Sequence, residues 1–116
     1  MSLIAAIAFA VCPPPPTRRE SCVHDGDTFW IGREKLRFEG ISAPELDGRC
    51  ERERALARRA RDRLVELLNT DGVRVVYTGK RGAFGRALVR VPGVGEALIK
   101  EGLAVRYGVK RDWCRD

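Results

Sequence analysis

The sequence has a single histidine, no closely spaced pair of cysteines and no long apolar run. His24 is that histidine, and the four cysteines include no C-x-x-C pair. A tetrahedral zinc site usually draws on close-spaced ligand pairs, so the pattern argues against structural zinc. The apolar stretch Leu3–Val11 is too short to cross a bilayer, and no basic residue precedes it as in a secretory signal. We therefore expect a first β-strand there and no association with a membrane.

Length and charge restrict the architecture and the partners. The 116 residues, of which 44% are hydrophobic, suffice for one domain (1–116) with one modest core. Lys and Arg number 22 against 16 Asp and Glu, a net charge of +6. This excess favours a polyanionic partner such as nucleic acid. Only four of these cations are Lys, so the composition also fits a GC-rich genome.

The cysteines form an even set, Cys12, Cys22, Cys50 and Cys114. Two disulfides formed in an oxidising compartment suit a small domain, which indicates a secreted or periplasmic protein. Three pairings are possible. Pairing Cys12 with Cys22 would close a Pro-rich loop, and pairing Cys50 with Cys114 would tie the C-terminus to the central helix. Four reduced thiols in a cytosolic protein are the alternative.

Hydrophobic periodicity predicts one long helix and several short strands. Residues Arg52–Leu68 carry an apolar stripe at Leu56, Ala60 and Leu64, which predicts the long helix. A second, short helix is expected over Gly95–Glu101, and Gly102 is expected to end it. Strands are expected at Leu3–Val11, on either side of the Asp25-Gly26-Asp27 turn within Cys22–Ile31, and at Lys35–Ile41, Val73–Thr78 and Arg86–Val91. This order is typical of a small closed barrel with helices on its outside.

Six arginines cover much of the long helix. They are Arg52, Arg54, Arg58, Arg59, Arg61 and Arg63. A solvated helix surface is the simpler interpretation of this face, and a nucleic-acid-binding stripe is the alternative.

Two sequence motifs place charge where a phosphate or a cation binds. Asp25-Gly26-Asp27-Thr28 puts two carboxylates on a turn, a common way to hold a hard cation, although isolated Asp-Gly turns are frequent. Arg37 lies in the middle of an apolar strand, where it needs a bound phosphate or a paired anion such as Glu39 or Glu45.

Two further candidates stand where strands begin or end. Glu45 follows Ala43-Pro44 just past a strand end, a position that suits a general base, although lone loop glutamates are usually inert. Arg86 follows Phe84-Gly85 at the start of the next strand. His24 precedes the acidic turn and is better explained as a surface residue than as a base.

The motifs occur together and in a specific order. They are Asp25-Gly26-Asp27-Thr28, Leu36–Glu45, Phe84–Leu88 and Gly102-Leu103-Ala104. In order and spacing they resemble the staphylococcal nuclease (thermonuclease) family from about Cys22 to Tyr107. The helix start at Cys50 and the closing Trp113-Cys114 are similar to the secreted bacterial branch of that family.

The resemblance implies a mainly β, α+β fold: a five-stranded OB-type barrel packed by two to three helices. It also implies calcium-dependent hydrolysis of DNA and RNA, with nucleic acid as the partner of a monomeric chain. The implied metal ligands are Asp27, Ser42 and the carbonyl group of Ala43. Asp25 would not contact the metal directly but would support its ligands. Glu45 would orient or deprotonate the attacking water, and Arg37 and Arg86 would clamp the phosphate. Phe84 and Tyr107 would contact the substrate.

The chain departs from the family pattern at two places. Ser42 stands where the family has a metal-binding Asp, so we expect calcium to be bound weakly, unless Glu39 restores an anion. Ala83 or Gly82 replaces an Asp and Phe84 replaces a Tyr in the loop that contacts phosphate, although Phe84 still stacks on a base for about 1–3 kcal/mol.

These observations leave three functional hypotheses. The first is a metal-dependent nuclease without sequence preference. The second is a nucleic-acid-binding module on the same barrel, catalytically impaired by Ser42. The third is a secreted scaffold for protein interactions, which would leave Arg37, Glu45 and Arg86 without a role.

Overall fold

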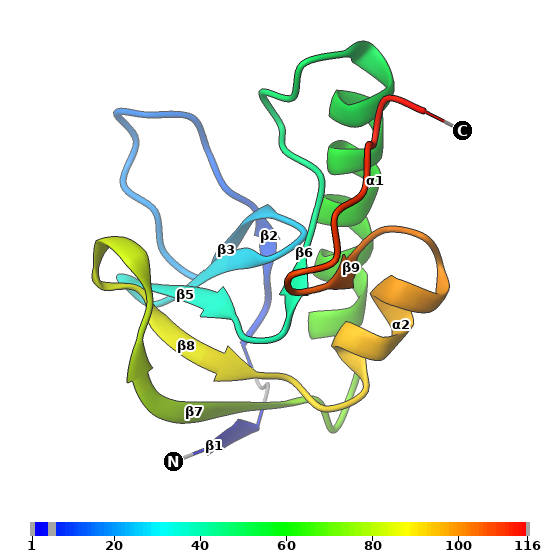
Figure 1. Ribbon diagram of the computed structural model, residues 1–116. Helices are drawn as coiled ribbons and strands as arrows, with labels where there is room; N and C mark the ends of the chain where they lie inside the picture. The colour runs from blue at the N-terminus through cyan, green and yellow to red at the C-terminus, as the bar shows by residue number, and fades with distance from the viewer. Residues whose placement is uncertain (1, 5–6, 116) are drawn as a thin grey trace.

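A computed structural model describes residues 2–4 and 7–115 as an α+β fold (Figure 1). The larger sheet has seven strands in the spatial order β1-β7-β8-β5-β4-β3-β2. In that order they span Ser2–Ile4, Arg74–Arg81, Ala87–Arg90, Glu34–Phe38, Thr28–Ile31, Cys22–Asp25 and Ala10–Val11. A small second sheet pairs β6 (Ile41–Ser42) with β9 (Val105–Arg106), and the helices are α1 (Glu51–Leu68) and α2 (Val94–Lys100). No helix in the described ranges is long and apolar enough to cross a membrane.

The sheet is open where we expected a closed five-stranded barrel. Within the described ranges, hydrogen-bonded pairing ends at β1 on one side and β2 on the other. These two short strands occupy the outer edges of β7 and β3, which a closing pair would need. Closure is therefore not detected, and two N-terminal strands cover the edges instead.

The N-terminal segment shows that this open sheet is strongly curved. Five residues separate β1 from β2, so the chain between Ile4 and Ala10 spans at most about 21 Å. The edges of a flat seven-stranded sheet lie about 29 Å apart. The expectation of one continuous strand over Leu3–Val11 is wrong, because the segment contributes to both edges; its residues 5–6 lie outside the described ranges.

Asn69, at the end of α1, fixes the segment before β2. Its side-chain oxygen accepts a hydrogen bond from the Phe9 amide at 2.8 Å, and its amide donates to the Phe9 carbonyl at 3.0 Å. The Phe9 ring packs edge-on against Phe29, with 6.0 Å between ring centroids. The Asn69 side chain thus pairs both the backbone NH and the backbone carbonyl of Phe9, which lies just before β2.

Helix α1 is the main cover of the sheet, and its predicted bounds are confirmed to within one residue. Cys50 caps its first turn by accepting a hydrogen bond from the Glu53 amide through Sγ at 3.3 Å. Its fully buried face is Ala57, Ala60, Leu64 and Leu68. The alanines let the helix approach the β3–β4 hairpin closely, whereas the leucines fill the core farther along. The short helix near residue 95 and the left-handed Gly102 after it are also confirmed.

Both disulfides join the expected partners, Cys12 with Cys22 and Cys50 with Cys114. The first ties β2 to its neighbour β3, and the second ties the C-terminal segment to the start of α1. The described cysteines are all bonded, which is consistent with an oxidising compartment.

The two disulfides should stabilise the fold unequally. They close segments with sequence separations of 10 and 64 residues. In the chain-entropy model, the losses in free energy of unfolding are about 3 kcal/mol for the Cys12→Ser/Cys22→Ser variant and about 4 kcal/mol for Cys50→Ser/Cys114→Ser. Urea unfolding under oxidising conditions measures both. A larger loss in the first variant would contradict the expected order.

Candidate active site

The acidic turn lies between β3 and β4 and is buried. Asp25 and Asp27 are only 6% and 8% exposed. Between them, Gly26 lies against α1 and the strand that follows β5: a β-carbon there would come within 2.8 Å of the Ala43 β-carbon and 2.9 Å of the Ala60 β-carbon. Glycine is thus required for this packing, which presses two carboxylates against the protein interior.

Asp27 makes the most hydrogen bonds of the residues in this turn. Its Oδ2 accepts a hydrogen bond from the Ala43 amide at 2.9 Å, and its Oδ1 accepts one from the Thr28 hydroxyl at 3.2 Å. Its amide donates to Asp25 Oδ1 at 3.1 Å. These bonds fix the orientation of the Asp27 carboxylate and leave acceptor capacity on both oxygens.

Arg37 projects from β5 toward this carboxylate. Its Nη2 lies 3.5 Å from Asp27 Oδ2, and its Nη1 donates to the Phe38 carbonyl at 2.7 Å. The side chain is mostly buried, so the guanidinium is held in place. The alternative partner Glu39 is wrong for Arg37: Glu39 pairs with Arg90 on β8 at 2.8 Å, which also removes it as a substitute metal ligand.

A pocket of about 360 Å³ brings together three of the predicted residues, Arg37, Arg86 and Tyr107. The two arginines belong to neighbouring parallel strands, because β5 and β8 pair in parallel and Arg86 immediately precedes β8. Arg86 Nε donates to the Ala83 carbonyl at 3.0 Å. No described carboxylate lies within ion-pair distance of Arg86, so this cation is available to an anionic ligand.

Phe84 does not join the lining of that pocket. It stands at the tip of the β7–β8 loop, is 96% exposed and has a left-handed backbone with φ of 61°. A non-glycine residue seldom adopts this conformation, and an exposed aromatic ring gains nothing from it within the fold. The structure therefore leaves this ring in solvent, outside the pocket that holds Arg37 and Arg86.

Glu45 lies on the loop between β6 and α1, where Glu53 holds the loop. The Glu45 amide donates to Glu53 Oε2 at 3.1 Å, and Glu53 is only 8% exposed. Gly48 packs so closely on Glu53 that a β-carbon would come within 2.5 Å of that side chain. Glu53 was not predicted from the sequence, because a carboxylate in the first turn of a helix ordinarily signals only helix polarity.

Electrostatic interactions link Glu45 to the acidic turn. Partial burial raises the pKa of Glu45 above its ordinary value; the charges of Asp27, Asp47 and Glu53 raise it further, and Arg37 opposes them. Raising the pKa strengthens the Glu45 carboxylate as a base, which suits the removal of a proton from water.

Asp25 has the most strongly shifted pKa in the site. Burial, and then the neighbouring Asp27, raise the pKa of Asp25 to about 8. His24 lies 3.9 Å from Asp25, but burial and then the charge of Arg19 lower the pKa of this imidazole, so it offers little positive charge at neutral pH. Within the described ranges, Arg37 is therefore the only arginine or lysine within ion-pair distance of the acidic turn.

The residues of the turn fit a hard divalent cation. Asp25 keeps its proton up to about pH 8 beside Asp27 and Arg37, and a hard cation bound by the turn would favour loss of that proton. Ala43 is adjacent through its amide, and Ser42 precedes it on β6, half-buried and paired with Val105. Within the described ranges, no group of three or more Asp, Glu, His or Cys side chains is arranged to hold a metal ion.

Neither the scan against protein-family models nor the search of curated proteins finds a match to this chain.

The raised pKa of Asp25 predicts how stability depends on pH. The unfolded chain loses this proton near pH 4, whereas the folded chain keeps it up to about pH 8. Between these values the unfolded state binds fewer protons, so this carboxyl lowers the free energy of unfolding as pH rises. Asp25→Asn should therefore stabilise the protein at pH 8 by more than about 1 kcal/mol, and by less at pH 5.

Urea unfolding with chelator present, at pH 5 and pH 8, measures this difference. The amide side chain of the Asp25→Asn variant can still accept the hydrogen bond from the Asp27 amide, so the geometry is kept. Asp71→Asn, at an exposed position, is the matched control and should change neither value. An equal effect of Asp25→Asn at both pH values would show that this carboxyl does not carry the raised pKa.

Proposed function

We propose that this chain is a metal-dependent phosphodiesterase that hydrolyses DNA or RNA without sequence specificity. The observation that carries the proposal is the convergence of Arg37 and Arg86, from two neighbouring strands, on one pocket beside the buried Asp27. Two guanidinium groups on one pocket are the donors that a phosphate group matches best.

The chemistry of phosphodiester hydrolysis explains why both arginines are needed. As water attacks in line, negative charge grows on the equatorial phosphate oxygens. Guanidinium groups fixed beforehand stabilise this charge more in the transition state than in the ground state. Arg37 is fixed by Asp27 and the Phe38 carbonyl, and Arg86 by the Ala83 carbonyl.

A calcium ion is the proposed cofactor, with Asp27, Ser42 and the Ala43 carbonyl as its ligands and Asp25 behind them. When bound, the cation supplies positive charge for the phosphate oxygens and lowers the pKa of water. Glu45 is the proposed base that orients the water and takes its proton, while Glu53 keeps the loop that carries it in position.

The resemblance to the staphylococcal nuclease family and its OB-type barrel remains part of this proposal. It is supported by the strand order β3-β4-β5-β8-β7 with one parallel pair, and by the strong curvature of the sheet. Two disulfides support a secreted or periplasmic location, and we propose that the chain acts as a monomer.

Digestion of denatured DNA with calcium, and with chelator, tests the proposed activity. We expect cleavage that requires the metal. Arg86→Ala should lower kcat at least about 100-fold, because it removes one preorganised donor from the phosphate. Glu45→Gln should abolish cleavage while binding persists.

Arg59→Ala is the matched control for Arg86→Ala, because it removes an exposed arginine from the outer face of α1. It should leave kcat unchanged. Equal activity of the wild type in calcium and in chelator, or equal loss in both arginine variants, would contradict the proposal.

A nucleic-acid-binding module is the second candidate, and Ser42 is the observation that favours it. With a neutral hydroxyl at this position, the proposed metal site has one directly ligating carboxylate, Asp27. Salt-sensitive binding of DNA without cleavage at millimolar calcium would identify the module.

Ser42→Asp should strengthen calcium binding if Asp27 and residue 42 share the cation. Because the variant adds a charged ligand, we expect the calcium concentration for half-maximal activity, or for half-maximal thermal stabilisation, to fall about tenfold, which corresponds to about 1.4 kcal/mol. Ser42→Asn, which lacks the charge, is the control. Equal half-saturation in the wild type and Ser42→Asp would remove residue 42 from the site.

A further inference from the structure

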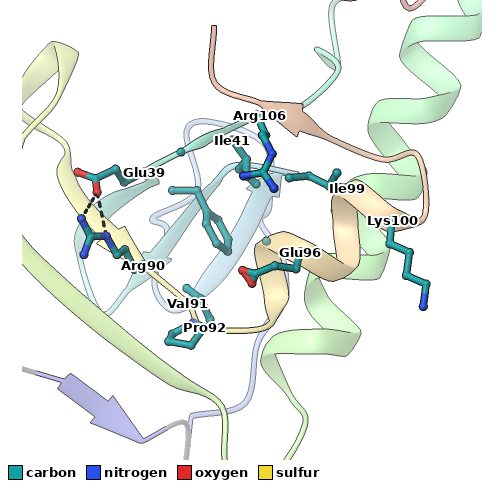
Figure 2. A pocket seen from close by; sticks show the side chains of 12 residues that line it. Glu39, Ile41, Arg90, Val91, Pro92, Glu96, Ile99, Lys100 and Arg106 are labelled. Carbon is teal, nitrogen blue, oxygen red and sulfur yellow. Dashed lines mark hydrogen bonds and ion pairs between the residues drawn. The ribbon is translucent and has the colours of Figure 1, made fainter. Parts of the chain in front are cut away.

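A second groove, of about 440 Å³, lies next to the pocket of the two arginines. Figure 2 shows it between the end of β5, the end of β8 and α2, with Arg106 above its floor. The floor is apolar and is formed by Phe38, Ile41, Val91, Pro92 and Ile99. Of the residues considered in the sequence analysis, Glu39 lines this groove, whereas the predicted catalytic, metal-binding and substrate-binding residues do not.

The groove and the arginine pocket share one wall, residues 38–40. Gly40 has a positive φ of 92°, and a β-carbon built there would meet no atom within 4 Å. The wall therefore carries no side chain at Gly40 where the two cavities adjoin. A ligand that lies in both cavities meets only backbone at this point.

Two consecutive residues after α2 stand on opposite sides of this junction. Tyr107 lines the arginine pocket, and Arg106 lines the second groove. Tyr107 begins the turn that follows β9 (Val105–Arg106), and its amide donates to the Gly40 carbonyl at 2.9 Å. The same hydrogen bond thus places an aromatic ring over one cavity and a cation over the other.

The charges of the groove leave Arg106 available to a ligand. Glu39 and Arg90 neutralise each other at 2.8 Å, as the dashed lines of Figure 2 show. Glu96 accepts a hydrogen bond from the Gly93 amide at 3.2 Å. No described acidic group lies within ion-pair distance of Arg106, and this side chain is exposed. An apolar floor beneath a cation suits a base with its adjoining phosphate.

We propose that the second groove binds the neighbouring nucleotide of the same single strand whose phosphate lies between Arg37 and Arg86. Arg106 binds the adjoining phosphate, and the base packs on the floor at Pro92 and Ile99. This inference rests on the proposed function and adds that the substrate is a chain longer than a dinucleotide. Continuity across Gly40 and the cation on the far side favour a nucleic acid strand over a separate apolar ligand.

Binding of fluorescein-labelled oligothymidylates in chelator, where no cleavage occurs, tests the inference. The octamer dT8 should bind more tightly than the dinucleotide dT2. Arg106→Ala should weaken dT8 binding about tenfold and reduce its log–log salt slope by about 0.7, the value for one phosphate contact on a single strand. Binding of dT2 should not change.

Glu96→Gln should change dT8 affinity in the opposite direction from Arg106→Ala. Glutamine still accepts the Gly93 amide, so the fold is kept, and loss of the negative charge should tighten dT8 binding severalfold. Arg59→Ala, on the far helix face, should change the salt slope for both lengths equally or not at all.

The outcomes separate this inference from the proposed function. Suppose that Arg86→Ala weakens the binding of both oligonucleotides, but Arg106→Ala changes the affinities for dT2 and dT8 by the same factor. The second groove then does not bind the strand, and the proposed function stands. If neither length responds to Arg86→Ala, the proposed function itself is wrong. Binding of an anionic fatty acid that dT8 does not displace from the groove would also overturn the inference.

Discussion

The contact between Asp27 and Arg37 is the interaction on which the rest of the site depends. It joins the buried acidic turn to the pocket of the two arginines, with 3.5 Å between Arg37 Nη2 and Asp27 Oδ2. Backbone pairing sets it in place, because the Phe38 amide donates to the Asp27 carbonyl at 2.9 Å and Thr28 pairs with Arg37. In the proposed function, this one carboxylate would both ligate the cation and pair with the guanidinium that binds the phosphate.

The surrounding structure keeps this contact rigid from several directions. Gly26 allows the turn to reach Ala60 of α1, and Glu53 of the same helix holds the loop of Glu45. The Cys50–Cys114 disulfide fixes the start of that helix. A helix that covers the core also positions the candidate base, so packing and proposed chemistry share the same residues.

The sequence was most informative where local chemistry determines the structure. The periodicity of 52–68 predicted α1, and the Asp-Gly turn predicted the β3–β4 hairpin. The resemblance to the staphylococcal nuclease family implied that Arg37 and Arg86 act together, and the two residues line one pocket. The sequence was least informative about non-local contacts. Nothing in Leu3–Val11 revealed that it serves two sheet edges, and nothing near Glu39 revealed Arg90 as its partner. Such pairings depend on strands distant in the chain.

The account predicts that cation and phosphate bind cooperatively. A cation at Asp27 would offset the negative charge that faces Arg37, so this guanidinium, still held by the Phe38 carbonyl, would attract a phosphate more strongly. Coupling between two ligands is reciprocal, so calcium affinity reports it. Calorimetric titration of the Glu45→Gln variant with calcium, alone and with saturating dT8, measures it directly. The account predicts tighter calcium binding in the presence of dT8; equal affinity in both titrations would contradict it.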